Sequence, residues 1–320
     1  LDKLLEDGRL DFEGVSATSA GAMNAAALAY GKTTGGNEKA RQVLEDFWRE
    51  TSDAGALYRH FHKNSLTKFW NLEDNPAFAH GFSMFENMMN TTSPYQINPL
   101  NMNPLKDVLE KTINFDEIHA CECLKLFITA TNVRSGTSKV FRNEEITIDV
   151  LLASAGLPFL FQAMEIDGEA YWDGGYLGNP SLWPLFYESR CRDILLVHVN
   201  PIVREDVPHT GAEIENRLNE ITFNAALMKE LRSISFVKKL INEDMLKSEY
   251  KDPYTDILLH AIRTDDTMTH LSVASKSDTD WGFLSDLREL GRAETDKWLK
   301  KHYDDIGKCA SVDIQADYLE

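Results

Sequence analysis

Two short motifs carry side chains that could do chemistry, and the first of them surrounds Ser19. The residues Ala17-Thr18-Ser19-Ala20-Gly21 come close to the Gly-x-Ser-x-Gly pattern of a nucleophile elbow, with alanine in place of the first glycine. In such an elbow, small residues on either side of the serine let a strand and a helix meet at a sharp corner. The corner exposes the hydroxyl at a helix N-terminus, where backbone N–H groups and the helix dipole favour a developing oxyanion. The same turn is also typical of a serine that only caps a helix, and the pattern alone leaves both interpretations open.

The second motif contains Asp173, which is the best candidate for the partner of Ser19. None of the nine histidines stands in a motif that would nominate it as a base, and His198 lies inside an apolar run, where we interpret it as a core residue. Asp173 precedes Gly174 and Gly175, which let the backbone approach another segment closely. A carboxylate held against a serine hydroxyl can accept its proton directly, without an imidazole between them.

The elements that must hold these motifs follow from hydrophobic periodicity and turn residues. Asp167-Gly168 lies between short apolar stretches and predicts a hairpin turn, whose second strand ends at Asp173. Elsewhere in the first two hundred residues we expect helices over 1–8, 20–30, 38–50, 103–113 and 149–156, a loop over 33–38, and strands over 12–18, 123–133 and 193–201. Residues 138–143 either pair with 123–133 or continue the sheet.

Residues 54–103 differ from the alternating elements around them. They are rich in aromatic and methionine side chains and show little strand alternation, so we predict short helices and loops inserted into an α/β domain. Two interpretations stay open. The segment is either a secondary hydrophobic cluster packed on the main body or a cap over an apolar substrate site, for which flexible methionine and aromatic side chains are suited.

The last third of the chain is mainly helical. Residues 211–242 predict a long amphipathic helix that either packs internally, which is the default, or makes a dimer. Residues 256–264 and 278–303 predict a strand and a final helix or helix pair. The apolar positions at helical spacing in the long helix are Ile214, Leu218, Ile221, Ala225, Met228, Leu231 and Ile234.

Strands that alternate with helices predict an α/β fold with a largely parallel sheet. We see no repeat, low-complexity tract or linker rich in Pro and Gly. We therefore expect a catalytic core over residues 1–204, with 54–103 as a cap-like insertion, and a helical extension over 205–320 that packs on the core.

Composition argues against several classes of function. The formal net charge of −18 makes the chain a poor candidate for nucleic-acid binding, which needs clustered Lys and Arg, and for electrostatic docking on anionic membranes. No run of about 18 apolar residues predicts a membrane span. The four cysteines form no Cys-x-x-Cys pair and lie beside no histidine cluster, so we expect reduced thiols, a cytoplasmic location and no metal. These cysteines are Cys121, Cys123, Cys191 and Cys309.

The two motifs, in this order, resemble the patatin-like phospholipase family, in a bacterial branch with a C-terminal helical extension. The segments that carry the resemblance are SATSAGAMNA and YWDGGYLGNP, with VLLASAGLPFLFQ and LFITATNVRSGTSKVFRN between them. YQINPLNMNPL and the C-terminal SKSDTDWGFLSDLRELGRAETDKWL resemble that branch. The likeness covers roughly residues 1–200 well.

The resemblance implies a three-layer α/β/α sandwich with a largely parallel central sheet, in which Ser19 is the nucleophile and Asp173 the general base of a Ser-Asp dyad. It also implies a glycine-rich oxyanion loop upstream of Leu1. Because the chain opens inside an amphipathic segment with no capping residue before it, we expect further residues upstream. The backbone N–H of Ala20 would supply one oxyanion donor. A dyad of this kind needs no metal ion or cofactor.

Two polar residues follow the strand predicted over 123–133. Asn132 and Arg134 lie just past its C-terminal end, where ligands bind in open α/β sheets. Arg134 is a candidate contact for a phosphate head group, and a surface turn residue is the alternative.

We therefore expect a serine acyl hydrolase that cleaves lipid acyl esters, of phospholipase A or lysophospholipase type, through an acyl-enzyme. One alternative keeps the dyad but acts on acyl-CoA, a glyceride or a polyester. The other is a lipid-binding pseudo-hydrolase, which Ala17 and the missing glycine loop favour. Transient contact with a membrane is compatible with either, and the sequence leaves the oligomeric state open.

Overall fold

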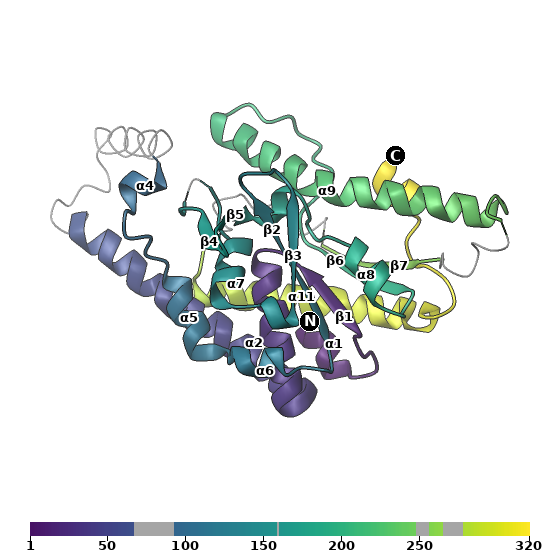
Figure 1. The fold of residues 1–320 in the computed structure, drawn as a ribbon, viewed down its shortest axis with the longest axis horizontal. Helices are drawn as coiled ribbons and strands as arrows, with labels where there is room; N and C mark the ends of the chain where they lie inside the picture. Colours follow the sequence, from purple (N-terminus) through teal and green to yellow (C-terminus); the bar gives the residue numbers. More distant parts are fainter. Residues whose placement is uncertain (67–92, 159, 248–255, 265–277) are drawn as a thin grey trace.

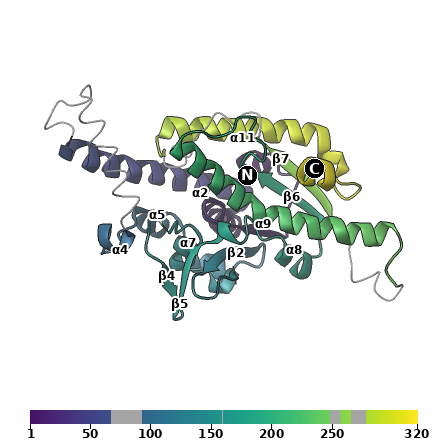
Figure 2. The same ribbon diagram turned by 90° about the horizontal axis from the view of Figure 1, so that it is seen from above.

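The computed structural model describes residues 1–66, 93–158, 160–247, 256–264 and 278–320. Within these residues the strands form a five-stranded sheet and a two-stranded sheet. Helices lie on both sides of the strands, as Figure 1 and Figure 2 show from two directions. The predicted α/β class with helical layers around a sheet is therefore confirmed.

Strand β2 (Lys125–Asn132) is the centre of the larger sheet, because three strands pair with it. β1 (Gly14–Ala17) pairs in parallel, whereas β3 (Ser138–Arg142) and β5 (Glu169–Asp173) pair antiparallel. β4 (Met164–Ile166) forms a hairpin with β5. The long crossover from β1 to β2 gives a parallel ladder, and the antiparallel ladders arise from the two hairpins and from the docking of the second hairpin on β2.

Helix α2 (Ala20–Leu66) begins directly after the Ser19 turn and consists of two helices that meet at a bend. Its first half is rich in alanine, and the residues from Ala22 to Ala29, Asn24 apart, are buried in the main core. Gly35 and Gly36 leave the helical conformation and turn the chain back. The two halves then touch so closely that a Cβ on Gly31 would lie 2.2 Å from Ala40 Cα. The predicted loop is therefore limited to the glycine pair.

Several shorter helices complete this side of the molecule. Asn103, Asn114 and Thr147 each cap one of them by accepting a backbone N–H on the side chain, as N-cap residues do. These helices are α4 (Pro94–Ile97), α5 (Pro104–Thr112), α6 (Phe115–His119) and α7 (Ile148–Ser154), with a short 3₁₀ turn over Asn143–Glu145.

The smaller sheet pairs β6 (Asp193–His198) with β7 (Leu258–Arg263) in parallel and has a helix on each face. On one face Ile194, Leu196 and Leu259 pack against α9 (Gly211–Asn242). On the other face Leu195 and Ile262 pack against α11 (Trp281–His302) and α1 (Asp2–Asp7). The remaining elements here are α8 (Trp183–Glu188), the 3₁₀ turns η2 (Gly174–Tyr176) and η5 (Tyr303–Asp305), and the π-helical turn η6 (Gln315–Leu319).

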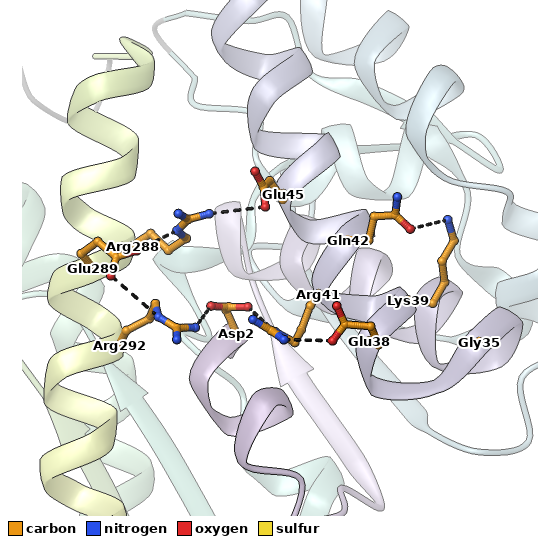
Figure 3. Close-up of a pocket in the computed structure, with 10 residues that line it drawn as sticks. All are labelled: Asp2, Gly35, Glu38, Lys39, Arg41, Gln42, Glu45, Arg288, Glu289 and Arg292. Atoms are coloured by element: carbon orange, nitrogen blue, oxygen red, sulfur yellow. Dashed lines mark hydrogen bonds and ion pairs between the residues drawn. The ribbon is translucent and has the colours of Figure 1, made fainter.

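A network of ion pairs holds α1 between α2 and α11 (Figure 3). Arg41 of α2 donates from Nε to Asp2 Oδ1 at 2.7 Å, and Arg292 of α11 pairs with the other oxygen of the same carboxylate. Arg292 Nη2 also lies 2.8 Å from Glu6 Oε1. Asp2 thus binds guanidinium groups from two different helices. Because its side chain is already ordered when the second pair forms, that pair costs less side-chain entropy than an isolated surface pair.

Most expected elements are present within a few residues of their predicted bounds. Gly8 ends α1 in the left-handed conformation, with φ 71°, and the Asp167-Gly168 turn has φ 52° and 79°. Two consecutive positive φ values are what a two-residue type I′ hairpin turn requires. The pairing of 138–143 with 123–133 is confirmed by the β2–β3 ladder.

The helix predicted over 38–50 is longer in the structure. It continues as the second half of α2 to Leu66, so 54–66 is not a series of short helices. The alanines and small polar residues past Thr51 are compatible with a helix, and the aromatic content misled the prediction. Residues 67–92 lie outside the described residues, and the choice between a packed cluster and a cap stays open.

The internal packing expected for the long helix holds for only part of it. Leu231 and Ile234 are buried, but Ile214, Leu218 and Ile221 are exposed. The N-terminal half of α9 instead turns Glu220 and Asn224 inward, where they bind Arg204 and the Pro201 carbonyl. These polar partners decide which face of α9 is buried.

The contact between Gly31 and Ala40 gives a first prediction. Gly31→Ala should lower the free energy of unfolding by about 1–3 kcal/mol or more, because the new methyl group meets backbone atoms that cannot move independently. Urea unfolding measures the change. Gly291→Ala is the matched control: it lies within α11 with open space around its Cβ, so it should stabilise by about 0.5–1 kcal/mol. Equal effects of the two substitutions would contradict the close crossing.

The ion-pair network gives a second prediction, on pH. Hydrogen bonds from Lys3 and Arg292 lower the pKa of Glu6 from 4.5 to about 2. A carboxylate whose pKa is depressed by folding stabilises the fold above its unfolded pKa and ceases to do so as the pH falls through its folded pKa. The stability difference between the native chain and Glu6→Gln should therefore be constant near neutral pH and shrink as the pH falls from 4.5 toward 2.

Urea unfolding at a series of pH values measures that difference. In an Arg292→Gln background the pH-dependent part should be smaller, because one of the two hydrogen bonds to Glu6 has been removed. A difference that does not change with pH would show that the Glu6 carboxylate does not stabilise the docking of α1.

Candidate active site

Ser19 stands at a strained corner between β1 and α2. Its φ of 56° is positive, which costs a residue other than glycine on the order of 1–3 kcal/mol and is typical of a functional site. Gly21 lies two residues further on, and a Cβ placed there would be 3.6 Å from the Cβ of Ala17. The extra methyl of Ala17 is therefore accommodated in ordinary contact where β1 passes into α2.

The register of β2 brings Asp173 to the same place. β3 pairs with Phe127 to Thr131, so it occupies one edge of β2 over that whole interval. β1 and β5 both pair with residues in the interval, so both must lie on the opposite edge. They approach from opposite directions, with Ala17 beside Ile128 and Asp173 beside Ala130. Two residues of a strand span about 7 Å, so the two strand ends meet nearly tip to tip.

The backbone after Asp173 passes through the gap between the two strand ends. A Cβ on Gly174 would lie 2.1 Å from Thr129 O and 2.9 Å from Thr18 Cγ2. The Thr18 hydroxyl donates to the Gly178 carbonyl at 2.7 Å. The residue before Ser19 therefore touches both ends of the loop that follows Asp173, and only glycine fits at position 174.

Ser154 links the corner to the sheet. Its hydroxyl accepts the backbone N–H of Ser19 at 3.1 Å and donates to the Thr129 carbonyl at 2.7 Å. The side chain is fully buried at the C-terminal end of α7. Ser154 was not predicted as a site residue. In the sequence it is a single hydroxyl at the end of an apolar helix, and only the packing of α7 against β2 brings it to its two partners.

Asp173 is held rigidly and is 1% exposed. Its Oδ1 accepts the backbone N–H of Gly175 at 2.7 Å, and its main-chain N–H donates to the Gly156 carbonyl at 2.9 Å. Burial raises the pKa of the neighbouring Tyr176 hydroxyl, and the Asp173 carboxylate raises it further. A buried carboxylate of this kind can accept a proton from a nearby hydroxyl.

The start of α2 offers hydrogen-bond donors at the same corner. Ala20 and Gly21 are exposed, and within the described residues their N–H groups have no acceptor, as expected for the first turn of a helix. Donors at a helix N-terminus favour negative charge. A hydroxyl at a strained corner, a buried carboxylate and free amide donors are together the parts that ester hydrolysis through a serine needs.

The structure gives Asn132 and Arg134 local roles in the turn between β2 and β3. Asn132 Oδ1 accepts the N–H groups of Arg134 and Ser135, each at 2.9 Å, and its Nδ2 donates to Glu169. The Arg134 guanidinium binds the Gly168 carbonyl and lies 3.7 Å from Glu169. These contacts favour the surface-turn interpretation of Arg134 over a head-group contact.

A hydrogen-bonded set of Ser, His and Asp side chains lies elsewhere, around His260 of β7. His260 is within 3.1 Å of both Ser311 Oγ and Asp193 Oδ1. The imidazole is 0% exposed, and Asp193 Oδ1 also accepts the N–H of Gly307 at 2.7 Å. Because substrate cannot reach a buried imidazole, we interpret this set as a structural network. His198 is likewise buried, beside Asn224, which agrees with its assignment to the core.

Two further features of the described residues concern a metal site and a cavity. No group of three or more His, Cys, Asp and Glu side chains is arranged to hold a metal ion. A cavity of about 860 Å³ opens between α1, α2 and α11 (Figure 3), but it contains neither Ser19 nor Asp173. Its lining is a set of paired ions, which does not suit an acyl chain.

Comparison with known proteins decides the family. A family model for patatin-like phospholipases matches residues 1–186, which is more than half of the chain and includes both Ser19 and Asp173. The chain belongs to the patatin-like phospholipase family. The resemblance of its motifs is thus confirmed, and this patatin-like phospholipase is a lipid acyl hydrolase. No curated protein matched the sequence. In the part of this patatin-like chain that the structure describes, no helix has the length and apolar character to cross a bilayer.

Ser154 gives a third prediction for this patatin-like chain. Ser154→Ala should lower the free energy of unfolding by about 1–3 kcal/mol, because it leaves the Ser19 N–H and the Thr129 carbonyl unpartnered in a buried place. Hydrolysis of a short soluble ester should slow as the corner loosens. Ser233→Ala is the control, since that exposed hydroxyl only donates to the Lys229 carbonyl of its own helix. It should change stability by less than about 0.5 kcal/mol, and equal losses in both variants would contradict the assignment.

Proposed function

We propose that Ser19 and Asp173 are the catalytic dyad of this lipid acyl hydrolase. The observation that carries the proposal is the convergence of β1 and β5 on one edge of β2, which supports proton transfer between the two side chains. The positive φ of Ser19 and the burial of Asp173 support it independently. The interpretation of Ser19 as a mere helix cap explains neither the strain nor the buried carboxylate beside it.

In the proposed reaction, Ser19 Oγ attacks the carbonyl carbon of an acyl ester while Asp173 takes the hydroxyl proton. The N–H groups of Ala20 and Gly21 stabilise the oxyanion, a contribution worth about 10²–10³ in rate per donor. Asp173 then returns the proton to the departing alcohol, and an acyl-Ser19 ester remains. Water gives a proton to Asp173 and attacks this ester; Asp173 then returns the proton to Ser19 Oγ as the fatty acid leaves, which restores the free enzyme.

We propose phospholipid or lysophospholipid as the substrate class, because the family acts on lipid acyl esters. Acyl-CoA, glycerides and polyesters fit the same chemistry, and a hydrolysis panel with these substrates separates them. We further propose that the catalytic core spans 1–204 and the extension 205–320; the family match, which ends at residue 186, supports this division. Four free cysteines support a reducing, cytoplasmic location.

The dyad gives the fourth prediction. Ser19→Ala and Asp173→Asn should each lower kcat by about 10⁴-fold or more, because removal of one member disables the whole unit. Ser19→Ala should also abolish labelling by a fluorophosphonate probe, whose adduct peptide mapping should find on Ser19 in the native chain.

Two matched substitutions serve as controls. Asp167→Asn makes the same chemical change in the hairpin turn, and Ser135→Ala removes an exposed hydroxyl near β2. Both should keep full activity. Substantial turnover by either dyad variant would refute the assignment of that residue. No adduct and no hydrolysis in the native chain would favour a lipid-binding pseudo-hydrolase.

A further inference from the structure

The outward face of α9 is apolar at one end and cationic at the other. Its positions recur at the spacing of three and four residues that keeps side chains on one side of a helix. Leu218 is 58% exposed and Phe236 is 61% exposed, although both are large apolar side chains. We call this set the α9 outer face: Ile214, Leu218, Ile221, Lys229, Arg232, Phe236 and Lys239.

The carboxylates over residues 218–239, the part of this face from Leu218 onward, point away from it. Between residues 218 and 239 the acidic side chains are Glu220 and Glu230. Glu220 is 7% exposed and pairs with Arg204 and Arg217. Glu230 accepts the N–H groups of Leu182 and Trp183. In a chain of net charge −18, a solvent-facing strip over residues 218–239 with three cations and no carboxylate needs an explanation.

One ion pair reaches this strip among the described residues. Lys239 Nζ lies 3.9 Å from Glu243, and both side chains are more than half exposed. A contact of this length between exposed groups is weak and is easily exchanged for another partner. The cationic character of the C-terminal half of the face therefore persists.

α9 also lies beside the candidate active site. Its Phe223 packs on Tyr176 with ring centroids 5.3 Å apart, and a Cβ on Gly175 would touch the same ring. Both contacts are to the turn that directly follows Asp173. α9 runs along the upper side of the molecule in Figure 1 and crosses in front of the strands when seen from above in Figure 2. Phe223 is on the opposite side of the helix from the α9 outer face, so a surface bound to that face would be separated from this turn by the width of α9, about 10 Å.

We propose that the α9 outer face docks the protein on an anionic lipid surface, with its apolar half toward the acyl chains and Lys229, Arg232 and Lys239 on the phosphate groups. The inference rests on the proposed function, since a docked bilayer would present substrate to Ser19. An amphipathic helix that lies in an interface combines these two features, apolar contact and cations that bind anionic lipid. Phe236 adds an exposed aromatic side chain to the cationic half of the face.

The overall acidity of the chain does not oppose this docking. Charges further apart than a Debye length, about 8 Å at physiological ionic strength, hardly interact through solvent. A membrane therefore responds to the face presented to it, and this face is cationic. The alternative occupant, a second copy of the chain, fits poorly. A two-fold axis across the middle of α9 would set the cations of one copy against the apolar half of the other, which leaves charges desolvated and unpaired.

Cosedimentation with sucrose-loaded vesicles tests the proposal. The full chain with Ser19→Ala is used so that lipid is not consumed, and the vesicles are phosphatidylcholine alone or phosphatidylcholine with about 30% phosphatidylserine. The chain should bind the anionic vesicles more strongly, and added salt should weaken the binding. Lys229→Gln with Arg232→Gln should reduce binding to the anionic vesicles about 5-fold for each charge removed. Leu218→Ser with Ile221→Ser should reduce it as well.

The control pair, Lys300→Gln with Lys301→Gln, removes two exposed cations from α11 and should leave binding unchanged. In the chain with native Ser19, all these variants should hydrolyse a short soluble ester at the native rate. A soluble ester that is not hydrolysed counts against the proposed function, whereas vesicle binding is read independently of it. Equal binding to both vesicle types, no binding, or binding unaffected by the α9 substitutions would overturn the proposal. So would a dimer that the α9 substitutions convert to monomer without any effect on vesicle binding.

Discussion

One edge of β2 receives two strands, and the candidate site depends on that constraint. β1 arrives in parallel and β5 antiparallel, and neither can extend without colliding with the other near Thr129. Both chains must leave the sheet there. The hydrogen bonds that a continuous neighbour would have made are replaced, and the Thr129 carbonyl accepts the Ser154 hydroxyl instead. The corner at Ser19 and the loop after Asp173 are thus two consequences of one interrupted ladder.

The strain at this junction is offset by the packing around it. A left-handed Ser19 costs on the order of 1–3 kcal/mol, and it persists because both flanking segments are fixed. On one side the alanine-rich start of α2 is buried in the main core. On the other side, Thr18 is tied to Gly178 and Ser154 holds the Ser19 N–H. Buried alanines allow a close approach of helix to sheet, so the small residues after Ser19 serve the corner as well as the core.

Local patterns in the sequence were sufficient for the parts of the site that local chemistry determines. The turn at Ser19 between a strand and a helix and the Asp167-Gly168 hairpin turn follow from turn residues alone. Which edge of β2 each strand would take could not be predicted, because it depends on the order in which distant segments pair. Ser154 was missed for the same reason: its two partners are distant in sequence.

The long helix α9 shows most clearly where periodicity fails. Its bounds were predicted correctly, yet Ile214, Leu218 and Ile221 face solvent. A regular apolar stripe indicates one face of a helix but does not tell which partner covers it. In α9 the buried face is chosen by Glu220, which satisfies two arginines, and by Asn224, which binds a carbonyl. Burial of these polar groups costs little because each is hydrogen-bonded or ion-paired where it lies. The apolar residues that remain on the outside are available to a lipid surface, and the cations beside them favour an anionic one.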